Sequence, residues 1–315
     1  MNTEEKEFSV VILIYNEEGN IISLNDEIVK SISNLSSNYE IIYINDGSRD
    51  KSLSELRSLN GVTIINMNRN YGQATALDAG FKHANGKYVI SLDGDGQNDP
   101  KDILPLYKKL IDENLDVVAG WRKDRKDSGN IKILTKIGRF VRRLFIADHV
   151  HDTGCTLRVY RREVIKTLDI GGEMHRYILA LIKWKGFSIG ELIVSHRPRI
   201  HGKSKYNCSK AFRGLIDLIW IWFINKYSQR PRHLFGYLSF ISFFFSVLTL
   251  GVTFYDKFFH GTSLSSNGWF FISAFLLISS MMLFSFGMII DLLIRIQLNN
   301  SPYEKRYYIR EIINK

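Results

Sequence analysis

The chain has few cysteines, since Cys155 and Cys208 are the only two among 315 residues. Two thiols are too few for a disulfide framework or a cysteine-rich zinc site, so both are excluded. The GxGxxG fingerprint and the GxxxxGKS/T loop are also missing, which leaves a dinucleotide fold and a P-loop unsupported. The opening segment, MNTEEKEFSV, is acidic and polar and does not read as a secretory signal peptide.

Charge is missing from two long runs, Leu234–Tyr255 and Trp269–Ile290, each of 22 residues. As helices, each would be about 33 Å long, enough to cross a hydrocarbon core of about 30 Å. Long helices in soluble cores usually keep a polar face, which these runs lack. Two transmembrane helices are therefore predicted, rather than two buried core helices.

The charges that flank these runs predict their orientation. Cations precede the first run and follow the second, and the connector 256–268 has only Lys257; the flanking cations are Lys226, Arg230, Arg232, Arg295, Lys305, Arg306 and Arg310. Positive charge gathers on the cytosolic side of membrane proteins. We therefore expect a multi-pass protein of the inner (cytoplasmic) membrane with both termini and the large N-terminal region in the cytosol.

The formal net charge of +10 comes from 42 Lys and Arg against 32 Asp and Glu. Such a charge is compatible with nucleic-acid binding. The cations concentrate beside the predicted membrane segments, however, where the orientation rule already accounts for much of them. We therefore expect a lipid bilayer as a partner and no nucleic acid.

The first 120 residues alternate apolar, β-branched runs of strand length with longer stretches of helical spacing. The runs are Phe8–Tyr15, Ile41–Ile44, Val62–Ile65, Tyr88–Leu92 and Asp116–Ala119, and the helical stretches include Ile21–Leu35 and Thr75–Lys82. This order predicts an α/β fold with a mostly parallel sheet and helices on both faces. Ligands of such sheets bind beyond the carboxyl ends of strands, where Asn16, Asp46, Asn68 and Asp93 follow four of the runs.

The densest acidic cluster, DGDGQNDP, starts at Asp93 directly after a predicted strand. Carboxylates at Asp93 and Asp95 with the amide oxygen of Gln97 form a hard-oxygen site suited to Mg²⁺ or Mn²⁺. An EF-hand is excluded, because Asn98 stands where its glycine should be and Leu104 where its glutamate should be. A plain acidic turn before a helix stays open as the alternative.

Two further polar loops are ambiguous by themselves. The loop NDGSRD contains Asp46 and Asp50, which suit either a nucleobase or ribose contact or a turn with a helix cap. The loop YNEE, at Tyr15, Asn16 and Glu17, leaves the same two alternatives open.

Taken in order, several segments resemble family 2 glycosyltransferases with the GT-A fold: VVILIYNEEGNI, INDGSRD, NRNYGQATALDAGF and SLDGDGQNDP. Later segments resemble the polyprenyl-phosphate branch, which is similar to dolichol-phosphate mannosyltransferase: GWRKDR, DTGCTLRVYRREV, EMHRYILAL and HRPRIHGKSKY. The resemblance covers about residues 8–235. The QxxRW motif of processive synthases is missing, and SLDGDGQNDP stands where many relatives have DADLQ.

The resemblance implies a role for individual residues. Asp93 and Asp95 would be catalytic, with Gln97 completing the metal ligands, and Arg199 and Lys205 would close over the diphosphate. The donor nucleotide would be held by Tyr15, Asn16, Glu17, Asp46, Asp50, Asp93 and Ser204. The sugar would lie near Asp152, Glu173, His175 and Arg176.

The basic stretch 121–143 is the candidate acceptor region, and we favour Arg122 and Arg139 as ligands of the acceptor phosphate. Its cations fall largely opposite its apolar residues on a helix, which suits a membrane interface; a core helix with a solvated basic face stays open. The segment 212–227 has the tryptophans and tyrosine of a membrane–water boundary.

The resemblance implies an inverting glycosyltransferase that moves a sugar from a nucleotide-diphosphate donor to a polyprenyl phosphate (undecaprenyl phosphate in a bacterium), for cell-envelope glycan or lipid modification. The expected parts are a cytosolic GT-A catalytic domain (1–210), an interfacial helix and linker (211–233), two transmembrane helices (234–295) and a cytosolic tail (296–315). The alternatives are transfer to another lipid such as diacylglycerol, and a non-catalytic sensor of nucleotide sugars. A homo-oligomer, such as a tetramer, stays open.

Overall fold

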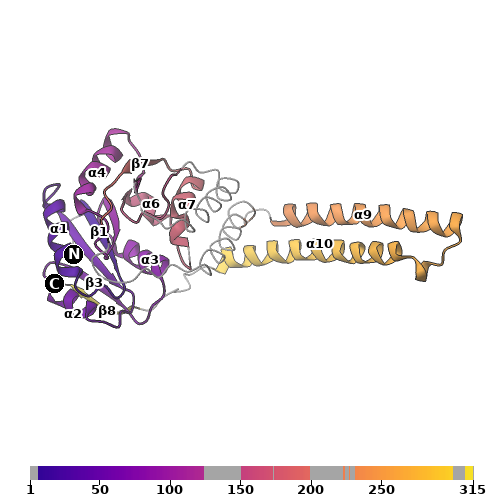
Figure 1. Ribbon diagram of the computed structural model, residues 1–315, viewed down its shortest axis with the longest axis horizontal. Helices are drawn as coiled ribbons and strands as arrows, with labels where there is room; N and C mark the ends of the chain where they lie inside the picture. Colours follow the sequence, from indigo (N-terminus) through magenta and orange to yellow (C-terminus); the bar gives the residue numbers. More distant parts are fainter. Residues whose placement is uncertain are drawn as a thin grey trace. The chain divides into compact units, whose positions relative to one another are not determined.

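The computed structural model describes residues 6–123, 150–172, 174–198, 223, 227, 231–300 and 309–314. The chain forms two compact units, and each is described by itself below. The first unit comprises Met1–Leu218 and Lys305–Lys315, and the second comprises Ile219–Glu304. The first contains a sheet with its covering helices and the second contains two long helices (Figure 1).

The first unit is built on an eight-stranded sheet with the order β7-β5-β6-β4-β1-β2-β3-β8. The strands are β1 (Phe8–Ile14), β2 (Tyr39–Asn45), β3 (Thr63–Met67), β4 (Tyr88–Asp93), β5 (Val117–Trp121), β6 (Arg158–Arg161), β7 (Ile189–Ile193) and β8 (Ile309–Asn314). β1 pairs in parallel with β2 and β4, β2 with β3, and β5 with β7, while β6 and β8 are antiparallel to their neighbours. The predicted α/β class and all five predicted strands are confirmed.

Helices cover both faces of this sheet (Figure 1). One face carries α1 (Ile21–Ser33), α2 (Ser52–Ser58), the 3-10 turn η1 (Pro100–Asp102) and α4 (Ile103–Asp112); the other carries α3 (Gln73–His83), α6 (Arg162–Lys166), η2 (Met174–Tyr177) and α7 (Ile178–Trp184). Successive side chains of a strand point to opposite faces of the sheet. In β1, Val10 packs in the core with α1 and Val11 packs in the core with α3.

Two helices show why these segments fold as they do. In α1, the buried Ile21, Leu24, Ile28 and Ile32 recur every three or four residues, which gives the helix one apolar stripe against the sheet. In α3, Gly80 permits close packing, because a Cβ there would lie 2.5 Å from a Val11 methyl carbon. The helix α3 thus lies directly on β1, and its first residues reach the carboxyl edge of the sheet.

The C-terminal strand β8 is a feature that the sequence analysis did not predict. Residues 309–314 fall in the range expected to be a tail, yet they pair antiparallel with β3, with Ile64 opposite Ile313. The chain therefore leaves the first unit, forms the second, and returns to complete the sheet of the first.

The second unit consists of α9 (Pro231–His260), a short 3-10 turn η3 (Leu264–Ser266) and α10 (Gly268–Asn300). Hydroxyl groups link the two long helices: Ser239 lies 3.1 Å from Ser280, and Ser246 donates to the Ser273 carbonyl at 2.8 Å. Small residues at such a seam let helices approach closely in a membrane. In the most apolar 18-residue stretch of each helix, only 17% of the residues in α9 and 11% of those in α10 are buried. These are therefore not core helices of the described structure. Both are long and apolar enough to span a membrane.

Candidate active site

Four parallel strands bring their carboxyl ends to one edge of the sheet. The register places Leu13 beside Asp93, Ile14 beside Asn45, and Asn45 beside Asn66. The loops that follow β1, β2, β3 and β4 therefore meet at this edge, as the sequence predicted. They contain most of the described residues to which we assigned a role in binding the donor or a metal.

The loop after β1 is fastened to the loop after β2. The N–H groups of Asn16 and Glu17 donate to the hydroxyls of Ser48 and Ser52, at 3.0 Å and 2.9 Å. Asn16 has a positive φ of 56°, a conformation that asparagine tolerates, and its side chain accepts the N–H of Arg49 at 2.8 Å. These contacts fix the backbone next to Tyr15.

The next two N–H groups of the same loop donate to carboxylates. Glu18 donates to Asp50 at 3.1 Å and Gly19 donates to Glu55 at 2.8 Å. Burial opposes ionisation of Asp50, but hydrogen bonds from Ser52 and Glu18 prevail and lower the pKa of Asp50. We call residues 15–19 and 48–55 the cradle. Its four successive N–H groups, from 16 to 19, are all engaged within the protein.

Asp46, predicted to hold the nucleotide, shapes the loop that follows β3. Its carboxylate accepts the N–H groups of Tyr71 and Gly72 at 2.7 Å and 3.0 Å, and the side-chain amide of Asn70 at 2.9 Å. Burial raises the pKa of Asp46, and the two backbone hydrogen bonds act in the opposite direction. Both carboxylate oxygens are thus engaged in holding this loop at the entrance to α3.

The predicted metal ligands Asp93, Asp95 and Gln97 form what we call the acidic corner, at the end of β4. Asp95 is buried, and its carboxylate accepts the N–H of Gln97 at 3.1 Å. Asp93 accepts the side-chain amide of Gln73, the first residue of α3, at 2.9 Å. The side chain of Gln97 donates to the carbonyl of Arg197. The loop therefore holds two carboxylates and one amide within five residues.

The acidic corner has the electrostatic character of a cation site. Burial, and then the charge of Asp95, raise the pKa of Asp93 to about 7, against hydrogen bonds from Thr156 and Gln73 and the attraction of Arg122. A divalent cation would offset the repulsion between the two carboxylates. Among the described residues no group of three or more His, Cys, Asp or Glu is placed to hold a metal.

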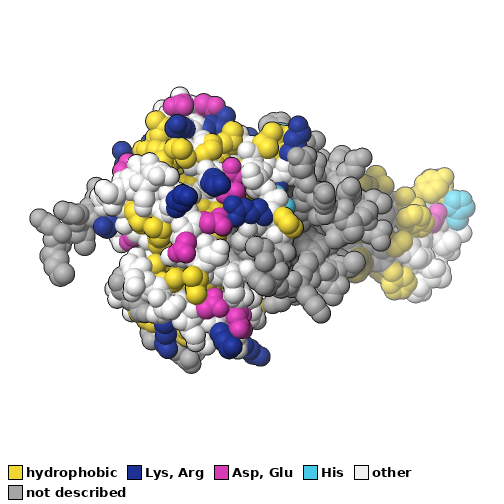
Figure 2. Space-filling model, turned by 60° about the vertical axis from the view of Figure 1, so that its left-hand side comes forward, with side chains coloured by type: hydrophobic (Ala, Val, Ile, Leu, Met, Phe, Trp, Pro, Cys, Tyr) yellow, Lys and Arg dark blue, Asp and Glu magenta, His cyan; other side chains and the backbone are white. Residues whose placement is uncertain are grey.

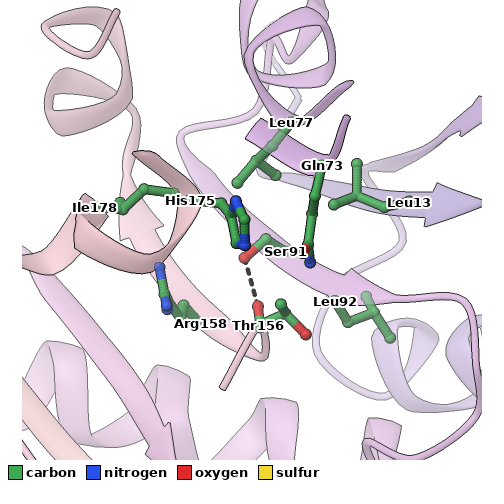
Figure 3. Close-up of a pocket in the computed structure, with 9 residues that line it drawn as sticks. All are labelled: Leu13, Gln73, Leu77, Ser91, Leu92, Thr156, Arg158, His175 and Ile178. Carbon is green, nitrogen blue, oxygen red and sulfur yellow. Dashed lines mark hydrogen bonds between the residues drawn. The ribbon is translucent and has the colours of Figure 1, made fainter. Parts of the chain in front are cut away.

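Thr156 connects the acidic corner to the segment before β6 through hydrogen bonds. Its hydroxyl hydrogen-bonds Asp93 and accepts the side-chain amide of Asn98 at 3.1 Å. Its carbonyl accepts the hydroxyl of Ser91 at 2.6 Å, the bond dashed in Figure 3. Neither Thr156 nor Gln73 was predicted as a site residue, although both lie inside the motifs that carried the resemblance.

A small cavity lies beside these residues (Figure 3). It is lined by Leu13, Gln73, Leu77, Ser91, Leu92, Thr156, Arg158, His175 and Ile178. Arg158 is 2% exposed and donates to the carbonyls of Cys155 at 2.8 Å and Thr153 at 2.7 Å. It thereby holds the segment that carries Thr156 to Asp93. Burial raises the pKa of the Cys155 thiol to about 11, so that thiol is unsuited to catalysis.

Arg122 and Asp152, predicted for different roles, form one ion pair. The guanidinium donates to both carboxylate oxygens, at 2.7 Å and 3.1 Å, and each side chain is only about an eighth exposed. Burial opposes ionisation of Asp152, but the hydrogen bonds and charge of Arg122 prevail and lower the pKa of Asp152. Arg122 also lies near enough to Asp93 to influence its pKa. The pair thus lies beside the acidic corner.

The remaining predicted site residues divide into two groups. His175 lines the cavity of Figure 3, and the neighbouring Arg176 donates to its ring at 3.4 Å. The others lie outside the described residues and stay predictions: Arg139, Glu173, Arg199, Ser204 and Lys205.

Figure 2 shows basic and acidic side chains interspersed on one face of the described surface.

The model of the family described as "Glycosyl transferase family 2" matches residues 9–169, slightly more than half of the chain. The chain belongs to glycosyltransferase family 2. This family 2 enzyme is 33% identical to the dodecaprenyl-phosphate galacturonate synthase of Rhizobium johnstonii, over 98% of this chain and 93% of the relative. It is 37% identical to the undecaprenyl-phosphate 4-deoxy-4-formamido-L-arabinose transferase of Aeromonas hydrophila, over 69% of this chain and 68% of the relative. The resemblance inferred from the motifs is confirmed.

Solved structures confirm the GT-A fold of this glycosyltransferase. Glucosyl-3-phosphoglycerate synthase from Mycobacterium tuberculosis, in complex with Mn²⁺ and UDP-glucose, has a TM-score of 0.54 at 18% identity, over 69% of this chain and 79% of that one. Mannosyl-3-phosphoglycerate synthase from Rubrobacter xylanophilus has a TM-score of 0.57 at 14% identity, over 69% and 74%. At such identities the likeness concerns the fold alone.

Proposed function

We propose that this glycosyltransferase moves a sugar from a nucleotide-diphosphate donor to a polyprenyl phosphate, with inversion at the anomeric carbon. One observation carries the proposal: the similarity to a dodecaprenyl-phosphate galacturonate synthase extends over 98% of this chain. That extent includes the two long helices as well as the sheet. The part of the chain suited to meet a lipid acceptor is therefore shared with that relative.

The donor would bind at the carboxyl edge of the sheet, against the cradle and the acidic corner. The four cradle N–H groups from residue 16 to residue 19 and the carboxylate of Asp46 already have partners within the protein. We therefore expect the donor nucleotide to meet a loop surface whose shape is set in advance. Such preorganisation lowers the entropy lost on binding.

Asp93, Asp95 and Gln97 would hold Mg²⁺ or Mn²⁺, which when bound supplies positive charge next to the departing diphosphate. An oxygen of the acceptor phosphate would bond to the anomeric carbon while the bond from that carbon to the diphosphate breaks. The nucleoside diphosphate leaves with the bonding electron pair. A phosphate monoester is largely ionised at neutral pH, since its second pKa is about 6, so no general base is required. The protein contributes mainly by placing the two reactants in line.

The Arg122–Asp152 ion pair favours a phosphate acceptor over a hydroxyl acceptor such as diacylglycerol. A hydroxyl acceptor would need a carboxylate base, and Asp152, which the resemblance implies to lie near the sugar, would be one candidate. Arg122 lowers the pKa of Asp152 despite its burial, which makes that carboxylate a weaker base. Asp152 in turn fixes the guanidinium of Arg122 beside Asp93, where we place the acceptor phosphate.

The return of the chain to the sheet supports the proposed membrane topology. Since β8 pairs with β3, the segments before α9 and after α10 both connect to the first unit. If α9 and α10 cross a membrane, both ends of this hairpin lie on one side of it. Together with the flanking cations, this supports a cytosolic location for the catalytic unit and both termini.

A turnover assay tests the proposal. Membranes that contain the protein would be given Mn²⁺, undecaprenyl phosphate and individual nucleotide sugars, and released nucleoside diphosphate would be measured. We expect release with one or a few donors, and none when the lipid is omitted or EDTA is added. Release with diacylglycerol but not with undecaprenyl phosphate would contradict the acceptor, and donor binding without release would favour the sensor.

A further inference from the structure

A short segment beyond β7, residues 195–197, is fastened to the loop of the acidic corner. We call this segment the strap. His196 and Asn98 form an antiparallel β-bridge, and the N–H of Arg197 donates to the carbonyl of Gln97 at 2.9 Å. We call the loop of the acidic corner, residues 93–99, the metal loop. The strap and the metal loop therefore form a two-stranded contact, although they lie about a hundred residues apart in the sequence.

The guanidinium of Arg197 ties this contact to a third segment. One of its terminal nitrogens lies 2.7 Å from Glu27 in α1, and the other lies 2.7 Å from Asp99 in the metal loop. The side chain of Arg197 is 33% exposed, and those of Glu27 and Asp99 are 39% and 16% exposed, so both ion pairs are open to solvent on the side of Arg197, where such pairs add little to folding stability. The contribution of Arg197 to function is therefore separable from its contribution to stability.

The strap also orients the side chain of Gln97. Its amide nitrogen donates to the carbonyl of Arg197 at 3.4 Å. A carbonyl accepts hydrogen bonds and does not donate them, so the nitrogen of the Gln97 amide must face the strap. The amide oxygen, which is the atom a hard cation requires, is then directed away from the strap.

We propose that Arg197 is a positioning residue for the metal site: it fixes the strap between α1 and the metal loop, and through the strap holds the Gln97 amide oxygen ready for a divalent cation. The inference rests on the proposed metal site. Partners that orient a metal ligand typically contribute about 10–100-fold to metal affinity. Arg197 itself contacts neither substrate nor metal.

A purely electrostatic role and a positioning role of Arg197 predict opposite effects of Arg197→Ala on Mn²⁺ affinity. If only charge mattered, the loss of a cation beside Asp99 and Glu27 would leave two carboxylates uncompensated and strengthen Mn²⁺ binding. If Arg197 positions Gln97, Mn²⁺ binding becomes weaker. Arg197→Lys keeps the charge but loses the planar fork that reaches two carboxylates. The direction of the change therefore separates the two explanations.

The test is Mn²⁺ binding to the full-length protein in detergent, measured by the loss of the free-ion EPR signal. We expect Arg197→Ala to raise the Mn²⁺ dissociation constant about tenfold and Arg197→Lys to raise it nearly as much. Glu27→Ala should have a smaller effect and add little in the Arg197→Ala background, since both act through the same contact. Lys109→Ala, which removes the ion pair with Glu113 at the end of α4, is the matched control.

Two results would overturn the inference: unchanged or tighter Mn²⁺ binding by Arg197→Ala, or a loss matched by an equal loss of folded protein in circular dichroism. Wild-type protein that binds no Mn²⁺ would instead overturn the proposed metal site, and this inference with it. The two failures are distinguishable because only the second one appears in the wild type.

Discussion

The cradle and the acidic corner lie at the same edge of the sheet but differ in how they are stabilised. In the cradle the four N–H groups from 16 to 19 are all engaged by side chains of the loop after β2 and of α2. In the acidic corner, burial and then the charge of the neighbouring Asp95 raise the free energy of the ionised form of Asp93. The backbone N–H groups of the cradle are thus satisfied without a ligand, whereas a bound cation would offset the repulsion between the two carboxylates of the corner.

The cradle is therefore expected to contribute mainly to folding stability, and the acidic corner mainly to metal binding and turnover. Substitutions in the cradle should lower stability and leave metal affinity unchanged. Substitutions in the corner should abolish or weaken function and leave stability unchanged or higher, as is common where buried charges serve catalysis. The four predictions that follow test this contrast.

The largest effect is expected for Asp95→Ala. The loss of one of two carboxylates should reduce turnover by at least about a thousandfold, because the charge on the departing diphosphate is then poorly compensated. The measurement is nucleoside diphosphate release in the complete assay, with Asp112→Ala, an exposed carboxylate of α4, as the control. Turnover within threefold of the wild type would remove Asp95 from the metal site.

A smaller effect is expected for Thr156→Val, which keeps the shape but removes the hydroxyl between Asn98 and Asp93. The Mn²⁺ dissociation constant should rise about tenfold, since an orienting partner is lost. Thr167→Val, at the end of α6, is the control. Mn²⁺ affinity equal to that of the wild type would show that Asp93 is held adequately without Thr156.

In the cradle, Ser52→Ala leaves the partly buried N–H of Glu17 without the hydroxyl of the buried Ser52. The cost should be about 1–3 kcal/mol of unfolding free energy, or roughly 2–8 °C in melting temperature. Mn²⁺ affinity should stay unchanged. The exposed Ser58→Ala is the matched control in the same helix, and a loss of Mn²⁺ affinity in Ser52→Ala would break the contrast.

The smallest expected effect is a gain in thermal stability, for Asp93→Asn. The pKa of Asp93 is raised from 3.8 to about 7 in the folded state, so its contribution to stability is fully present below pH 3.8 and is lost as the pH rises from there through about 7. In EDTA, Asp93→Asn should therefore raise the melting temperature by a few degrees at pH 8 and by clearly less at pH 5. A melting temperature that falls equally at both pH values would contradict the raised pKa.

The sequence predicted the parts of the fold that repeat a local pattern. The strands β1 to β5 follow from apolar runs, and α1 and α3 from helical spacing. The strand β6 was missed because it is only four residues long and begins and ends with arginine. The strand β8 was missed because its partner β3 lies about 250 residues earlier, and no local pattern reveals such a pairing.

For the site, the sequence predicted which residues gather but not how they are connected. The acidic corner could be predicted because Asp93, Asp95 and Gln97 lie within five positions of the chain. The Arg122–Asp152 pair joins residues that were predicted to hold the acceptor phosphate and the sugar, and it spans 30 positions of the chain. The strap reaches the metal loop over a hundred positions. Such contacts depend on the strand order of the sheet, which the local pattern does not encode.

The position of β8 after both long helices has a consequence for biosynthesis. A ribosome makes residues 309–314 after α9 and α10, so the edge of β3 stays uncovered until these residues have emerged. An uncovered edge strand is a template for pairing with another chain. Premature termination after α10 would leave that edge permanently bare, and the resulting protein should aggregate even though its catalytic loops are all present.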